Sequence, residues 1–184
     1  DLNLLKGVRA EALAKLYSGN ALLGSETGEI QFTDKAISGI PVMNLSHLCE
    51  NRKALKINLD LCPEINEKDL LNHIKYGVSN SPSIEFETIL NGIVNLKLGF
   101  AVMNRSGIKP QSKCNSLKDF QIKEVVNQLK NFEINIKSAK GFENAQVTKG
   151  GIKTNEVSSV TMMSKKATAL FICGEILDIH GDCG

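Results

Sequence analysis

Alternating apolar and polar residues predict short strands in two parts of this chain. Between residues 53 and 61, leucine and isoleucine alternate with lysine, asparagine and aspartate, the period of two typical of a strand with one buried face. Residues 132–137 repeat the pattern, and residues 29–33 give a shorter example after Gly28. We therefore expect β structure on both sides of the middle of the chain.

The segment at residues 8–16 fits two structures. Small and apolar residues alternate there with charged ones, as in a strand, yet the run RAEALAKL is rich in strong helix formers. Propensity alone favours a helix. Further on, a short helix is expected between Ser38 and Cys49, with Ser38 as its N-cap and Pro41 in its first turn.

The middle of the chain has the apolar spacing of helices, at i, i+3, i+4 and i+7. A first helix is capped by Asn66 and ends at Gly77, and a second starts after Ser81-Pro82. A third covers residues 96–103, and Ser116 caps the fourth. The pattern predicts a β region, a helical insert of four helices at about 64–130, and a return to β structure.

The apolar run at residues 169–173 predicts a strand buried on both faces, as in a parallel sheet flanked by helices. The chain ends soon afterwards at Gly184, and it begins at Asp1 rather than at a methionine. Such a strand needs neighbours on both sides and helices over it. We therefore expect this chain to be part of a longer protein.

Composition narrows the class of protein. The 184 residues carry 22 Lys+Arg against 20 Asp+Glu, a formal charge of +2, which gives no electrostatic case for nucleic-acid binding. No apolar run approaches the roughly 20 residues of a membrane span. The five cysteines form no C-x-x-C pair, which fits neither a disulfide framework nor a zinc site. Free thiols suit a reducing cytoplasm.

Glycines and carboxylates late in the chain are the candidate site. Gly174 and Glu175 directly follow the apolar run, where ligands bind in open α/β sheets, although a plain polar loop is an equally good interpretation. Gly150-Gly151 also fits a simple hairpin turn. The three histidines are too far apart in sequence for a metal site, so no metal is expected. No P-loop, G-x-S-x-G or G-x-G-x-x-G motif occurs.

Together, several motifs give the chain a family resemblance. It resembles the bacterial NAD(P)/FAD-dependent oxidoreductases that include aminoacetone oxidase. The matching segments occur in the family's order and cover nearly the whole chain: residues 28–33, Ile37-Ser38-Gly39-Ile40-Pro41, residues 57–63, Val147-Thr148-Lys149-Gly150-Gly151-Ile152, residues 161–165, residues 170–178 and Gly181-Asp182-Cys183-Gly184.

The resemblance implies an α+β fold within a larger α/β flavoprotein. In that family a Rossmann-type FAD domain is split by a barrel-like, mostly antiparallel β subdomain that carries a helical one. Residues 1–63 and 131–160 would form the β subdomain, residues 64–130 the helical insert, and residues 161–184 the segment that returns to the FAD domain. The same pattern makes residues 8–16 a strand.

The resemblance also implies a cofactor site. Gly174 and Glu175 would contact FAD, Asp182, Cys183 and Gly184 would lead to the isoalloxazine, and the Gly150-Gly151 turn would lie on the substrate side. FAD is expected in the longer parent and not bound to this chain alone. The catalytic residues are not identified by any motif.

One departure and one alternative accompany this interpretation. Met163 stands where the family usually has an acidic residue. The expected partners are a small-molecule substrate and NAD(P)H, with no membrane contact and nucleic acid not favoured. The alternative is an independent binding module, for nucleic acid or protein, that uses the helical insert; Lys123, Lys130, Lys137 and Lys140 would give it a modest basic face.

Overall fold

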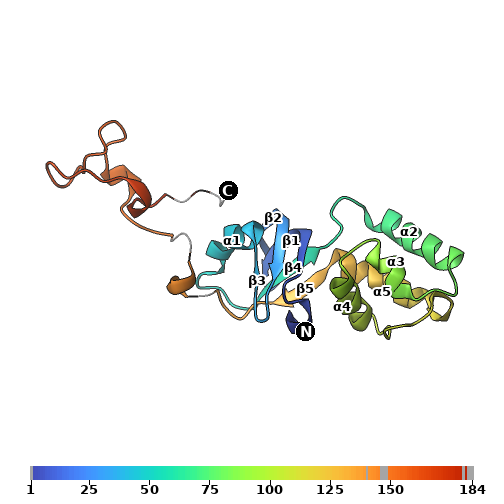
Figure 1. The fold of residues 1–184 in the computed structure, drawn as a ribbon. Coiled ribbons are helices and arrows are strands. Elements are labelled where there is room, and N and C mark those ends of the chain that lie inside the picture. The colour runs from blue at the N-terminus through green and yellow to red at the C-terminus, as the bar shows by residue number, and fades with distance from the viewer. Residues whose placement is uncertain (1, 140, 146–148, 180, 182–184) are drawn as a thin grey trace. The chain divides into compact units, whose positions relative to one another are not determined.

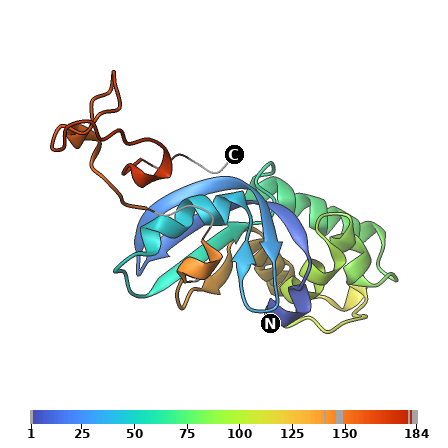
Figure 2. The same cartoon turned by 60° about the vertical axis from the view of Figure 1, so that its left-hand side comes forward.

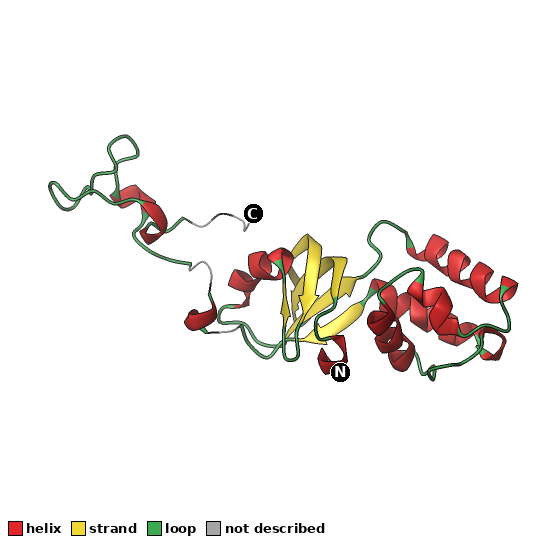
Figure 3. Cartoon of the chain, in the orientation of Figure 1, coloured by secondary structure: helices red, strands yellow, loops and turns green. Residues whose placement is uncertain are grey.

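The computed structural model describes residues 2–139, 141–145, 149–179 and 181. It divides the chain into two compact units, Asp1–Lys137 and Ser138–Gly184. Within the first unit, a curled sheet and a helical bundle lie side by side (Figure 1), and helices and strands are clearly segregated (Figure 3). Among the described residues, every helix is too short or too polar to cross a lipid bilayer.

The sheet of the first unit has five strands in the order β3-β2-β1-β4-β5, and every neighbouring pair is antiparallel. It curls around the short helix α1, which packs mainly against β2 (Figure 2). Together with the helices inserted between β4 and β5, this confirms the predicted α+β fold with a barrel-like antiparallel part. The strands are β1 (Arg9–Ser18), β2 (Ala21–Phe32), β3 (Ile37–Ser38), β4 (Leu55–Asp60) and β5 (Phe132–Asn135), and α1 is Ile40–Ser46.

The structure resolves the choice between helix and strand at residues 8–16, because β1 covers nearly all of this segment. It pairs with β2 on one side and β4 on the other, so both of its edges are hydrogen-bonded. Ala12, Ala14 and Leu16 are buried on one face, in the same apolar core as Phe32 and Phe132. This burial and two-sided pairing outweigh a helix propensity worth only a few tenths of a kcal/mol per residue. The prediction of a strand is confirmed.

Four helices connect β4 to β5. Each helix buries one stripe of apolar residues against the other helices, since a helix of this length is not stable alone in water. Leu70 and Ile74 are buried in the first helix, and Ile122, Val125 and Leu129 in the last. The helices are α2 (Glu67–Asn80), α3 (Phe86–Asn91), α4 (Leu96–Arg105) and α5 (Asp119–Lys130).

The predicted ends of two helices are wrong. α1 begins after Gly39, because Ser38 is hydrogen-bonded in β3 and cannot serve as the cap. α2 starts at the predicted cap, where the Asn66 side chain accepts a hydrogen bond from the Asp69 amide, but it runs through Gly77 to Asn80. A single glycine costs about 1 kcal/mol in a helix, which the packing of α2 offsets.

Two serines predicted as caps lie outside the helices that follow them. After Ser81, the segment to Phe86 pairs with residues 112–115, since the Cys114 amide donates to Ile84 O and the Phe86 amide donates to Ser112 O. α3 therefore begins only at Phe86. Ser116 closes a 3₁₀ turn, and α5 begins after Lys118, whose amide donates to Gln121 Oε1. The α2–α3 and α4–α5 connections pair with each other, and α3 and α5 therefore begin later than predicted.

The second unit is mostly loops held by single bridges and 3₁₀ turns. The expectation of a strand buried on both faces at residues 169–173 is wrong for this structure. The segment pairs briefly with residues 162–164, through Ser164 N to Leu170 O and Ile172 N to Met162 O. Ile172 is buried, whereas Leu170 and Phe171 are exposed. No described strand lies on the other edge, and a lone pairing of this length does not make a sheet.

Candidate functional site

In the second unit, the glycine turn packs against the segment that follows Gly174. The Ile152 amide donates to Ile176 O at 2.8 Å, and the Asp178 amide donates to Ile152 O at 2.8 Å. Residues Gly174–Ile176 form a 3₁₀ turn between these contacts and the apolar run. The structure thus brings Gly150-Gly151 and Gly174-Glu175, two separate parts of the predicted site, into one cluster.

Gly151 fits this cluster because it has no side chain. Its φ is +145°, and an added Cβ would lie 2.4 Å from Ile176 O and 2.9 Å from the Leu177 carbonyl carbon. Real Cβ atoms are not found that close to backbone, so the approach needs glycine. Gly150, at φ +104°, has no described atom within 4 Å of where its Cβ would be. Within the pair, it is Gly151 that permits the close backbone contact with the segment after Gly174.

A small apolar core holds the cluster together. Val157, Ile172 and Leu177 are buried, and Ile152 and Met162 pack against them. Met163, the departure from the family pattern, is half-buried and lines an open hollow of about 380 Å³ with Ser158 and residues 164–168. The hollow is flanked by Lys165 and Lys166, and the second of these forms an ion pair with Glu156 at 2.7 Å. An acidic residue at position 163 would meet positive charge here.

Gly174 and Glu175 have the properties of a surface that a polar ligand can approach. Gly174 has φ +80°, and no described atom lies within 4 Å of where its Cβ would be, so its backbone is open toward the residues that the structure describes. The Glu175 side chain is exposed and makes no hydrogen bond or ion pair with any residue that the structure describes. A free carboxylate beside open backbone fits the hydroxyl groups of a ribose or ribityl chain. Asp182, Cys183 and Gly184 lie outside the described residues.

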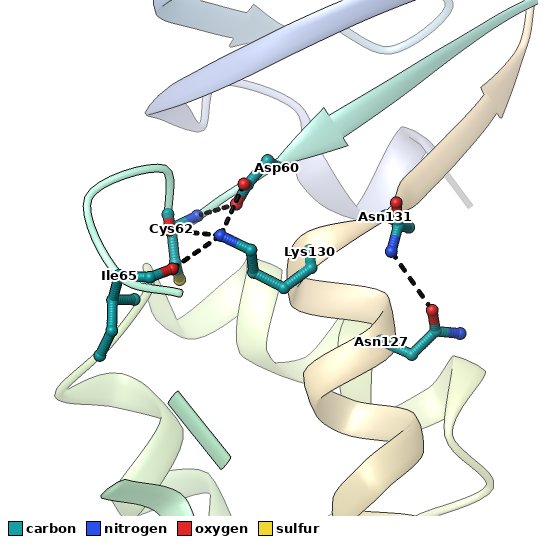
Figure 4. A network of polar contacts seen from close by, with 6 residues as sticks. All are labelled: Asp60, Cys62, Ile65, Asn127, Lys130 and Asn131. Carbon is teal, nitrogen blue, oxygen red and sulfur yellow. Dashed lines mark hydrogen bonds and ion pairs between the residues drawn. The ribbon is translucent and has the colours of Figure 1, made fainter. Parts of the chain in front are cut away.

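At the junction of sheet and helices in the first unit, a largely buried ion pair links β4 to the end of α5 (Figure 4). Lys130 Nζ lies 2.6 Å from Asp60 Oδ2, and both side chains are 14% exposed. The same ammonium donates to Cys62 O at 2.9 Å and to Ile65 O at 2.7 Å. Asp60 in turn accepts from the Cys62 amide at 3.0 Å. The end of α5 is thereby tied to the segment that leaves β4.

This ion pair removes one residue from the predicted basic face. Lys130 points inward, Lys137 follows β5, and Lys140 lies outside the described residues, so of the four lysines only Lys123 is on the exposed side of α5. No local pattern in the sequence links Lys130 to Asp60, because the two residues are 70 positions apart.

Cys62 lies beside this junction, and its thiol is expected to react slowly because its pKa is raised. Burial is the main cause that raises the pKa of its thiol to about 11; Asp60 adds to the rise and Lys130 opposes it. Cys62 lines an open hollow of about 360 Å³ with Glu11, Thr27, residues 61–65 and Ile93. Burial also raises the pKa of Cys49 and Cys114, and the four described cysteines are free thiols.

We expect an alkylating reagent to separate the cysteines by rate. Burial restricts access to the Cys62 thiol and raises its pKa to about 11, so at roughly pH 8 little of it is the reactive thiolate. Exposed Cys173 should therefore be modified well before Cys62, as peptide mass spectrometry of timed samples would show. In urea the rates should converge. Equal rates in the native chain would contradict the burial of Cys62.

No described group resembles a metal site. Among these residues, no three His, Cys, Asp or Glu side chains are placed to hold an ion. The ring Nδ1 of His47 lies 2.6 Å from Asn44 O, which gives this histidine a local structural partner. The cluster in the second unit offers a polar ligand the open backbone of Gly174 and the exposed carboxylate of Glu175 for hydrogen bonding.

The fold is thus an antiparallel, barrel-like sheet with an inserted helical bundle, followed by a glycine-containing cluster. Residues 2–147 match the family model described as "HI0933-like protein barrel and H2TH domain", and the chain belongs to this family. The match to this family covers nearly all of the first unit and the beginning of the second.

Three curated relatives support the same family. The chain is 32% identical over 182 residues to the 3-dehydro-bile acid delta(4,6)-reductase of Clostridium scindens, an alignment that covers 97% of the chain and 44% of the relative. It is 29% identical over 156 residues to the ribosomal RNA dihydrouridine synthase of Haemophilus influenzae, with 85% and 37% covered. The corresponding Escherichia coli enzyme is 25% identical, with 100% and 44% covered. The chain spans less than half the length of these relatives.

Proposed function

We propose that this chain is part of a bacterial, cytoplasmic FAD-dependent oxidoreductase that reduces a carbon–carbon double bond conjugated to a carbonyl. The observation that carries the proposal is the 32% identity, over 97% of the chain, to a protein named as a delta(4,6)-reductase. A dihydrouridine synthase also saturates a ring double bond next to a carbonyl, so both kinds of relative share one reaction class. When bound, reduced FAD would supply the hydride.

The residues of this chain would bind FAD and enclose the substrate, while the cofactor would supply the redox chemistry. Glu175 would accept hydrogen bonds from FAD hydroxyls, and Gly174 would let the cofactor approach the backbone. Gly150, with no described atom within 4 Å of where its Cβ would be, would leave room for the substrate. The sheet and helices of the first unit would cover the flavin and exclude water.

The 184-residue chain alone should bind FAD too weakly to measure. It contains no G-x-G-x-x-G turn for the pyrophosphate, so the remaining contacts are a few hydrogen bonds at about 0.5–1.5 kcal/mol each. Association costs an estimated 4–15 kcal/mol, which these contacts do not offset. Titration followed by flavin fluorescence is the measurement. Saturable quenching at low micromolar FAD would show that the main binding determinants are within this chain.

The protein encoded by the complete gene provides the direct test of function. It should purify with the absorbance spectrum of oxidised flavin, and NADH or NADPH should bleach it. Reoxidation should then follow addition of a 3-oxo-4-ene steroid or of ribosomal RNA, the two substrate classes that the relatives' names indicate. A complete protein that neither carries nor binds flavin would refute the proposal.

A further inference from the structure

A hollow of the first unit lies on the face of β1 opposite its buried alanines. Glu11 of β1 and Thr27 of β2 line it from the sheet, and residues 61–65, which lead from β4 to α2, line it from the side. Figure 4 shows Cys62 and Ile65 of this segment. Ile93, in the connection between α3 and α4, also lines the hollow. Its volume of about 360 Å³ is in the range of small-molecule pockets.

The walls of this hollow are mainly apolar and are held in place by hydrogen bonds. The Leu61 amide donates to Leu129 O at 2.8 Å, and Lys130 Nζ donates to Ile65 O at 2.7 Å. Because the wall is already ordered, it can receive an apolar ligand at little entropic cost. Five of the eight lining residues are apolar: Leu61, Cys62, Pro63, Ile65 and Ile93.

The two carboxylates that line the hollow carry unbalanced negative charge. Glu11 and Glu64 are both exposed, and neither forms an ion pair or a side-chain hydrogen bond with any residue that the structure describes. None of the described lining residues is a lysine or an arginine. The nearby Asp60 is different, because Lys130 neutralises it. An apolar hollow with two unpartnered carboxylates suits a ligand that is both apolar and cationic.

The position of Glu11 in the sheet adds to this preference. Glu11 lies directly opposite Glu29 of β2, and like charges placed in this way destabilise a strand pair. Arg9 neutralises only Glu29, with its guanidinium 3.1 Å from that carboxylate. A cation bound beside Glu11 would therefore reduce the remaining repulsion. An anion would increase it.

We propose that this hollow binds an amphiphilic ammonium compound, with an aliphatic or ring body against Leu61, Ile65 and Ile93 and its ammonium group near Glu11 and Glu64. The Thr27 hydroxyl can accept a further hydrogen bond from such a ligand. The inference goes beyond the proposed function, since the ligand need not be the compound that the flavin reduces. It does not require flavin, because every lining residue belongs to the first unit.

Titration of the 184-residue chain with n-octylammonium chloride at neutral pH, below its micelle concentration, tests the proposal. The NMR shifts of the backbone amides should change saturably at residues 27, 61, 62, 64, 65 and 93. Octanoate, which has a chain of the same length and the opposite charge, should bind at least about tenfold more weakly. Butylammonium should also bind at least about tenfold more weakly, because it buries less apolar surface.

Substitutions of the two carboxylates test the role of charge without changing the shape of the hollow. Glu11→Gln and Glu64→Gln should each weaken octylammonium binding about twofold to fivefold, the range expected for exposed charges, and should leave binding of neutral octanol unchanged. Glu85→Gln is the matched control, because Glu85 is an exposed carboxylate at the start of α3 that does not line the hollow. It should bind octylammonium like the parent chain. Circular dichroism of each variant verifies its folding.

Several results would overturn the proposal. They are an absence of saturation in the millimolar range, octanoate binding as tight as that of octylammonium, and equal effects of Glu11→Gln and Glu85→Gln. If the amide signals of the hollow moved on dilution of the chain alone, a second copy would cover the hollow and the proposal would be wrong. Flavin binding by the complete protein is measured separately, so this inference and the proposed function can fail independently.

Discussion

Replacing Lys130 by alanine should lower the free energy of unfolding by about 3–5 kcal/mol. The substitution leaves the Asp60 carboxylate largely enclosed without its ammonium partner and removes the donor to Cys62 O and Ile65 O. Breaking one side of an enclosed ion pair is costly, because the remaining charge cannot regain its water. The midpoint of urea unfolding, followed by circular dichroism, gives the change.

Two controls identify the enclosure as the cause. Lys123→Ala removes a lysine from the exposed pair with Asp119 and should have a much smaller effect, because surface pairs contribute little. The double variant with Lys130→Met and Asp60→Leu removes both charges and should recover part of the lost stability. If Lys130→Ala were no worse than Lys123→Ala, the junction of sheet and helices would not depend on this ion pair.

The substitution Gly39→Ala should cost about 3 kcal/mol, again as a loss of unfolding free energy. Gly39 has φ 108° and ψ 159°, a region that only glycine adopts readily. An alanine Cβ there would lie 2.2 Å from Glu29 O, in the backbone of β2. The start of α1 would have to move away from the sheet. Urea unfolding measures the loss of stability, and faster hydrogen–deuterium exchange of the α1 amides would show that the loss arises at this helix.

Gly19→Ala is the matched control. Gly19 also has a positive φ, of 58°, but nothing lies within 4 Å of its added Cβ. That substitution should cost only about 1–2 kcal/mol, the price of the left-handed conformation alone. Similar losses for the two glycines would mean that the contact between Gly39 and Glu29 relaxes easily.

The local pattern of apolar and polar residues was enough to predict the strands and helices that have one clearly apolar face. The alternation at residues 53–61 and the stripes at Leu70, Ile74 and Leu129 correspond to buried faces in the structure. These predictions hold because burial of a regular face dominates the energy of each element. The glycines at 39 and 151 also stood within recognisable motifs, although nothing in those motifs says which backbone they approach.

Tertiary contacts decided what lies beyond a local pattern. β1 is a strand because β2 and β4 pair with both of its edges, and α3 starts late because its approach pairs with residues 112–115. The sequence groups Lys130 with a basic face, whereas the fold brings its ammonium group to Asp60, 70 positions away in sequence. A sequence specifies which face of an element is apolar, whereas distant charges such as those of Asp60 and Lys130 meet only when the folded backbone brings them together.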